Sequence, residues 1–148
     1  MVSSRLFAAA AVTATAAVAV AGCGGSSAPS AQKRALAAAG TKFNAAMKAA
    51  KPKLMADASA KNFSALQSDY APISNANTDW DLAVKKIHFP AKLQSMRTAF
   101  ISAESVAEGD LLNIEGANSA SELVQGMARF SQDHKRAIAA FNKLLAAA

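Results

Sequence analysis

Apolar side chains recur at intervals of three or four residues through most of the chain beyond Ser30, which is the spacing of one face of an α-helix. The first such stretch begins after Ser30, a residue suited to capping a helix N-terminus, and its apolar face is Leu36, Gly40, Phe43, Met47, Ala50 and Leu54. Pro52 interrupts this face, so the helix either ends at Lys51 or kinks and continues to about Ala56. We favour the kinked helix, because only then does it match the length of the other three.

The second stretch has the most regular pattern. Asn62 is suited to capping its N-terminus, and the apolar seam that follows keeps a heptad spacing through Phe63, Leu66, Tyr70, Ile73, Asn77, Trp80, Val84 and Ile87. Because the seam continues across Pro72, the pattern predicts one helix with a bend at the proline. Asn77 is the one polar member of this seam.

Pro90 separates the second stretch from the third, since proline disfavours a helical residue before it and suits the first position of the next helix. The third helix has the apolar face Leu93, Met96, Phe100, Ala103, Ala107, Leu111 and Ile114, and Gly116 is suited to end it. Residues 119–122 (Ser-Ala-Ser-Glu) fit a capping box that opens the fourth helix. Its apolar face is Leu123, Met127, Phe130, His134, Ile138, Phe141 and Leu145.

Composition agrees with an all-α protein. Alanine, a strong helix former, supplies much of the 52% of hydrophobic residues, and runs of alternating β-branched residues are missing. The second and third helices each span about 26 residues, or roughly 39 Å. Four matched helices with short links predict an up-down-up-down four-helix bundle over residues 31–148. A three-helix arrangement with a loose first segment and a helical dimer are the alternatives.

The first 22 residues have a different character. A short segment with the single charge Arg5 precedes an uncharged run over residues 6–20, which has the length of a signal-peptide core and is short for a membrane-spanning helix. The run ends in Val20, Ala21 and Gly22, followed by Cys23, the only cysteine of the chain. A plain secretory signal with a chance cysteine is the alternative interpretation.

This ending resembles the lipobox of bacterial lipoprotein precursors, in which an aliphatic residue and two small residues precede the cysteine. The resemblance implies cleavage before Cys23, attachment of diacylglycerol to its thiol, and a further acyl chain such as palmitate on its amine. Two acyl chains hold a protein on a bilayer where one binds only marginally. Residues 23–30 are then the lipidated cysteine and a flexible Gly/Ser-rich tether, which reaches roughly 24 Å when extended.

The whole pattern is similar to that of small uncharacterised helical lipoproteins of actinobacteria. The shared features are the alanine-rich leader, the Gly/Ser tether, a tryptophan in the second helix (Trp80) and the junction from Ile87 to Pro90. The resemblance implies a helical bundle that is lipid-anchored on the extracytoplasmic face of the cell membrane. It implies no activity and no functional residue beyond Cys23.

Charge placement predicts an orientation. The chain carries a formal net charge of +6, of which the leader contributes only Arg5. An up-down bundle brings the start of the first helix, the link between the second and third, and the end of the fourth to one pole. That pole collects Lys33, Arg34, Lys85, Lys86, Lys92 and Lys143, together with His88. We expect this basic pole to face the membrane, while ordinary solubility charge is the alternative, and a nucleic-acid partner is not expected.

Two polar residues interrupt the apolar faces. Asn77 and His134 each lie about 15 residues from the start of helices that run in the same direction, so we expect them at similar heights in the bundle. They form either a self-satisfied pair, or residues turned to the edge of the core, that fixes helix register, or a buried polar layer that binds a water or, with Trp80, a small ligand.

Enzymatic and metal chemistry are not predicted. Bundle di-metal sites use a Glu-x-x-His motif, but the residue three before His134 is Ser131. Glu104 and Glu108 are four residues apart on one helix, which is typical of a solvated face. Phosphate-binding, dinucleotide-binding and serine-hydrolase motifs do not occur. The sequence therefore predicts a non-enzymatic envelope lipoprotein without metal or cofactor, a binding or scaffolding module for an envelope protein or wall component, with a small-ligand carrier or sensor as the alternative.

Overall fold

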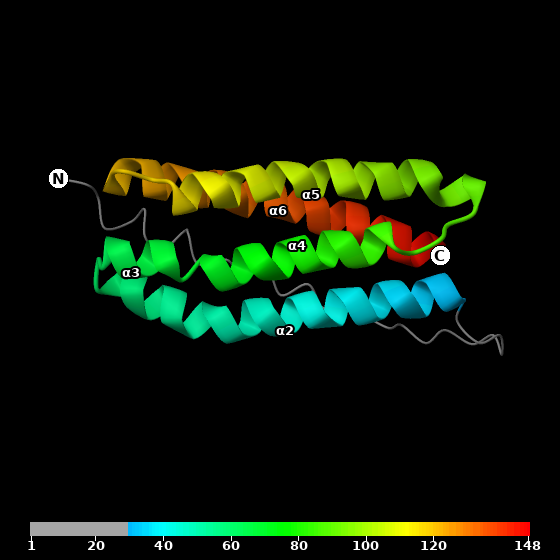
Figure 1. The fold of residues 1–148 in the computed structure, drawn as a ribbon, viewed down its shortest axis with the longest axis horizontal. Helices are drawn as coiled ribbons and strands as arrows, with labels where there is room; N and C mark the ends of the chain where they lie inside the picture. The colour runs from blue at the N-terminus through cyan, green and yellow to red at the C-terminus, as the bar shows by residue number, and fades with distance from the viewer. Residues whose placement is uncertain (1–29) are drawn as a thin grey trace.

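The computed structural model describes residues 30–148, and the leader, the lipobox and all but the last residue of the tether lie outside this range. The described chain is helical: α2 spans Ala31–Ser59, α3 Phe63–Ser68, α4 Ala71–Lys85, the short 3₁₀ helix η1 Ala91–Leu93, α5 Gln94–Glu115 and α6 Ala120–Ala147. These elements form an all-α four-helix bundle with alternating helix directions, α3 extending α4 at one end (Figure 1). The predicted fold class is therefore confirmed.

Both ends of the first helix follow from local chemistry. The Ser30 hydroxyl accepts a hydrogen bond from the Lys33 backbone N–H, as expected of an N-cap. The helix continues through Pro52 to Ser59, which confirms the kinked interpretation, and Figure 1 shows it bending in its second half. Lys61, in the left-handed region with φ of 54°, then turns the chain into α3.

The second predicted helix is two helices in the structure. Asn62 caps α3, its side chain accepting from the Ala65 N–H, but α3 ends at Ser68 and α4 begins at Ala71. The prediction of one continuous helix over residues 63–87 is therefore wrong. Pro72, in the first turn of α4, has no N–H for the carbonyl of Ser68 and its ring crowds that carbonyl, so the helix is interrupted there.

The apolar seam nevertheless survives this break. The two residues between the helices, Asp69 and Tyr70, keep right-handed helical angles, with φ of −71° and −79°. The chain therefore bends without losing its rotational phase. Six consecutive seam positions are buried: Leu66, Tyr70, Ile73, Asn77, Trp80 and Val84.

The link from α5 to α6 has the predicted caps with one difference. The Ser119 hydroxyl accepts from the Glu122 N–H at 3.2 Å. The Glu122 carboxylate in turn accepts a hydrogen bond from the Asn118 backbone N–H at 2.8 Å. In the standard capping box the donor would be the N–H of the capping residue itself, here Ser119, one residue later. Gly116 ends α5 as expected.

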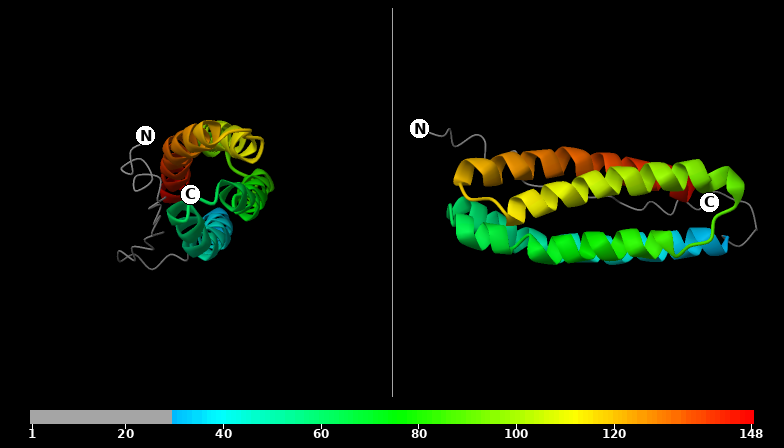
Figure 2. Two further views of the ribbon diagram at one scale, coloured as in Figure 1. Left: turned by 90° about the vertical axis from the view of Figure 1, so that its left-hand side faces the viewer. Right: turned by 45° about the horizontal axis from the view of Figure 1, so that its top comes forward.

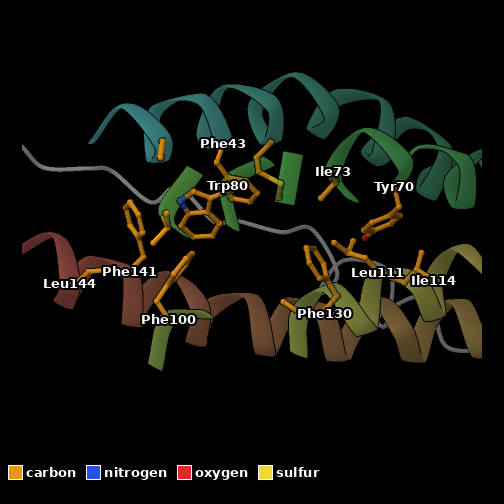
Figure 3. Packing of buried hydrophobic residues seen from close by; sticks show 14 of the residues in the cluster. Phe43, Tyr70, Ile73, Trp80, Phe100, Leu111, Ile114, Phe130, Phe141 and Leu144 are labelled. Atoms are coloured by element: carbon orange, nitrogen blue, oxygen red, sulfur yellow. The ribbon is translucent and has the colours of Figure 1, made fainter. Parts of the chain in front are cut away.

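The core is built on aromatic rings contributed by all four long helices (Figure 3). Trp80 of α4 stacks on Phe43 of α2 with centroids 4.4 Å apart, and meets Phe100 of α5 and Phe141 of α6 edge to face at 4.8 and 4.9 Å. Farther along the bundle Tyr70 packs edge to face on Phe130. Figure 2 shows the four helices arranged around this shared core when viewed from the end.

The buried face of helix α5 is wider than its predicted face. Phe100, Ala107, Leu111 and Ile114 are buried as predicted, but Met96 is 39% exposed and Ala103 is only half-buried. The buried residues of α5 also include Glu104 and Asp110, one on each flank of the predicted face. Two carboxyl groups therefore lie in helix interfaces.

Candidate functional site

The structure joins the three segments that the sequence assigns to one pole. The Ser30 hydroxyl donates to the backbone carbonyl of Ala148 at 2.7 Å, which ties the start of α2 to the end of α6. The Gln32 side-chain amide donates to the carbonyl of His88 at 3.4 Å, in the link between α4 and η1. Figure 1 shows these segments at the same end of the bundle. Ser30, the last residue of the tether, therefore lies at the pole formed by these segments.

The basic residues of this pole are all exposed: Lys33, Arg34, Lys85, Lys86, Lys92 and Lys143, with His88 beside them. The Lys85 ammonium forms an ion pair with the Asp81 carboxylate one helical turn earlier. Asp81, a buried acidic residue, therefore lies beside the lysines of this pole. The unit composed of residues 30–34, 85–92 and 143–148 is hereafter the basic pole.

The opposite pole is polar and mixed in charge. Gln67 of α3 donates to the carbonyl of Ala117 at 3.1 Å and to that of Glu115, which fastens α3 to the link between α5 and α6. Lys53 of α2 bridges Asp57 and Asp69. Since Asp69 is buried while Lys53 is largely exposed, this pair closes the edge of the α2–α3 contact.

Asn77 and His134 do not bond to each other. Asn77 is fully buried and its side-chain amide donates to the Glu104 carboxyl across the α4–α5 interface. His134 is equally buried, and its ring stacks on Phe130 at 5.1 Å and contacts Phe43 at 5.2 Å. Both ring nitrogens lack a hydrogen-bond partner. Burial lowers the pKa of His134 to about 4, so at neutral pH the ring is an uncharged part of the aromatic core.

Glu104 is a candidate functional residue whose burial the sequence did not predict. The expectation of a solvated Glu104–Glu108 face is wrong for Glu104, which is 1% exposed, whereas Glu108 is half-buried and accepts from the Thr78 hydroxyl at 3.2 Å. Burial, with smaller contributions from the charges of Asp81 and Glu108, raises the pKa of Glu104 to about 8. The sequence contained one signal for the burial of Glu104. Asn77 lies in an apolar seam, and a buried amide requires a hydrogen-bond partner.

A second carboxyl lies between α5 and α6. Asp110 is buried, and the Arg129 guanidinium approaches it to 3.4 Å. Burial raises the pKa of Asp110, and the adjacent Asp133 acts in the same direction. Asp133 in turn pairs with Arg136 at 2.6 Å. These contacts are those of an interhelical ion-pair network.

One hollow contains one of the three proposed ligand residues. A shallow hollow between α2 and α6 has room for about one water molecule, and it is lined by Gly40, Phe43, Asn44, Trp80, Ile138, Phe141 and Asn142. Trp80 alone of the three predicted pocket residues contributes to it. Within residues 30–148 there is also no group of three or more His, Cys, Asp or Glu side chains arranged to hold a metal ion.

Comparisons with protein-family models, with curated proteins and with solved structures give no match. In the part of the chain that the structure describes, none of the helices is both long and apolar enough to cross a membrane. Cys23, Val20, Ala21 and Gly22 lie outside the described residues, so lipidation stays a prediction.

Proposed function

We propose that the protein is a lipid-anchored module of the bacterial cell envelope, held on the extracytoplasmic face of the cell membrane through Cys23. The chain would serve as a non-enzymatic binding or scaffolding unit. The basic pole would face the lipid headgroups, and the mixed pole at residues 56–62 and 115–122 would be presented outward to an envelope protein or wall component.

The observation that carries this proposal is the position of Ser30. It lies seven residues after Cys23, and its hydroxyl is bonded to the last residue of the chain at the basic pole. A tether of this length reaches roughly 24 Å, so anchoring at Cys23 would hold the lysines of that pole near the headgroups. Each basic residue close to an anionic leaflet contributes about 1 kcal/mol of attraction, less with added salt.

Anchoring is tested in cells with the full chain. We expect the wild-type protein to fractionate with membranes and to incorporate a radiolabelled fatty acid, and Cys23→Ala to lose the label. Retention of the label in Cys23→Ala would refute lipidation at this residue. A label-free wild-type protein secreted after cleavage would support the plain secretory signal.

Orientation is tested with the chain from residue 24 onward, produced without lipid. Replacing Lys86, Lys92 and Lys143 by Glu should reduce its affinity for vesicles containing anionic phospholipid by roughly a hundredfold, because about 1 kcal/mol is lost per residue. The matched control replaces three exposed lysines away from this pole: Lys48, Lys51 and Lys135. Equal losses in both variants would show that only net charge matters and would refute a membrane-facing pole.

The small-ligand alternative receives less support. Asn77, Trp80 and His134 are packed in the core with other side chains, and a hollow that Trp80 lines is of water size. Because His134 is uncharged at neutral pH, burying its two unpartnered ring nitrogens costs less than burying a charged ring would. We therefore favour the binding or scaffolding function.

A further inference from the structure

Charge is unevenly distributed around the bundle. Helices α2 and α6 contain ten of the fifteen lysine and arginine residues of the described chain but three of its ten acidic residues. Residues 60–119, which include α3, α4 and α5, contain seven acidic and five basic residues. Helices α2 and α6 are neighbours, since Phe43 contacts His134 at 5.2 Å and Figure 2 shows α6 beside α2 in the end view. One side of the bundle is therefore basic.

The three acidic residues of α2 and α6 are engaged elsewhere. Asp57, in the last turns of α2, pairs with Lys53 at 3.1 Å. Asp133 pairs with Arg136 at 2.6 Å. Glu122 accepts a hydrogen bond from the backbone that leads into α6. Each of these carboxylates therefore already binds another group of the protein.

Three exposed lysines follow the groove between α2 and α6. Asn44 and Asn142 line the hollow between these two helices. Lys48 and Lys51 follow Asn44 by four and seven residues, so they lie on the same flank of α2. Lys135 precedes Asn142 by seven residues and lies on the facing flank of α6. We call these five residues the α2–α6 face. None of its lysines forms an ion pair within residues 30–148.

The positive charges are spread along the bundle axis. Lys33, at the basic pole, lies five turns before Lys51 on the same flank of α2, which separates the two by roughly 27 Å. The contact between Phe43 and His134 places Lys135 between them along the axis. A small anion would need several charges at one point. A row of single charges at intervals is suited to an extended polyanion.

We propose that the α2–α6 face binds an anionic polysaccharide of the cell wall, laid along the two helices. The proposal rests on the proposed extracytoplasmic location and adds a lateral wall contact to the outward pole. The ammonium groups of the three lysines would pair with the acidic groups of the polymer. The side-chain amides of Asn44 and Asn142, which can both donate and accept, would hydrogen-bond its hydroxyl groups.

The composition of the basic side favours a polysaccharide over other partners. In residues 30–148 none of the aromatic side chains is exposed, so the face offers no ring on which a nucleic-acid base could stack. Met55 is the one exposed large hydrophobic residue among the described residues of α2 and α6, so the apolar anchors typical of a protein interface are missing. The face also runs along the bundle axis, away from the pole that the tether would hold at the bilayer.

The test measures co-sedimentation of the full chain, in non-ionic detergent, with cell walls isolated from the bacterium that makes it. Replacing the three lysines of the α2–α6 face by Glu should weaken binding at least about tenfold, because each new carboxylate would face an acidic group of the polymer. The matched control has the same net charge and replaces Lys86, Lys92 and Lys143 of the basic pole by Glu. It should bind walls within about twofold of wild type. Circular dichroism checks that both variants are folded.

Soluble probes identify the chemistry that is recognised. The wild-type protein should bind polygalacturonate, an anionic polysaccharide, and should not bind neutral dextran, and added salt should weaken the binding. Equal losses in the two variants, or wall binding that survives in the α2–α6 variant, would overturn the proposal. Tighter binding to single-stranded DNA than to polygalacturonate would do the same.

Two further measurements separate this proposal from membrane anchoring. Binding to anionic phospholipid vesicles should be lost in the basic-pole variant and retained in the α2–α6 variant. The reverse result would make the α2–α6 face a membrane contact and refute wall binding. Cys23→Ala should bind polygalacturonate as wild type does, so a failure of lipidation and a failure of polysaccharide binding give different results.

Discussion

Replacing Glu104 with glutamine is expected to stabilise the protein, and increasingly so as pH rises. Gln keeps a carbonyl oxygen that accepts from the Asn77 amide, but it cannot ionise. Wild-type Glu104 has a pKa of about 8 in the folded protein, against 4.5 for an ordinary glutamate. Between these two values the folded protein holds a proton that the unfolded chain releases.

The sign and size follow from this difference. The contribution of Glu104 to stability is fully present below pH 4.5 and is lost as pH rises toward 8. At pH 7 the loss has an upper bound of about 3 kcal/mol, at 1.36 kcal/mol per pH unit. Because Glu108 and Lys85 beside this group are in contact with solvent, screening reduces the expected loss to about 1–2 kcal/mol.

Urea unfolding followed by Trp80 fluorescence measures this effect, since Trp80 is the only tryptophan and lies in the core. The free energy of unfolding of Glu104→Gln minus that of wild type should grow between pH 5 and pH 8. Glu108→Gln is the matched control, and its difference from wild type should change much less. A Glu104→Gln difference that is constant with pH would refute a protonated buried carboxyl, whatever its sign.

Two further predictions concern the stability of the bundle. Gly126→Ala should destabilise the protein by about 1–2 kcal/mol, because the added Cβ would lie 2.9 Å from a side-chain atom of buried Ile114. Gly109→Ala should stabilise the protein by about 0.5–1 kcal/mol, because the added Cβ would meet open space. Thermal unfolding compares the two, and equal effects would contradict the close α5–α6 approach. The free energy of unfolding of His134→Phe, relative to that of wild type, should increase by about 2 kcal/mol from pH 7 to pH 5. Below pH 6.5 the unfolded wild-type chain takes up a proton on His134, whereas the folded protein, in which the pKa of His134 is about 4, does not, so wild-type stability falls. Parallel urea titrations of both proteins at these two pH values measure the gain, and a pH-independent difference would contradict a buried neutral ring.

The sequence was sufficient for features that depend on local periodicity and capping. Ser30, Asn62 and Ser119 each accept the backbone hydrogen bond that their type predicts at a helix start. Even the break before Pro72 left the seam from Leu66 to Val84 intact, because both linking residues stay helical. The period of the apolar residues therefore identified the core-facing side of this segment without identifying where its helices end.

The burial of Glu104 in α5 could not be predicted in the same way. Ala103 and Glu104 are neighbours, and hydropathy alone favours burying the alanine. The structure buries the glutamate because Asn77 faces it from α4 and a carboxyl oxygen satisfies the buried amide. This preference arises from a pair 27 residues apart in sequence, and no pattern within α5 contains it.

The two buried carboxyl groups of α5 follow from partners on two neighbouring helices. Glu104 accepts from Asn77 of α4, and Asp110 pairs with Arg129 of α6. Because six residues separate the two carboxyl groups, they lie about 120° apart around the helix, and their partners oppose rotation of α5 in either direction. The close approach of Gly126 to Ile114 holds the α5–α6 contact as well. Keeping Glu104 protonated reduces stability at neutral pH, and polar groups that cost stability are known to specify register in other helical assemblies.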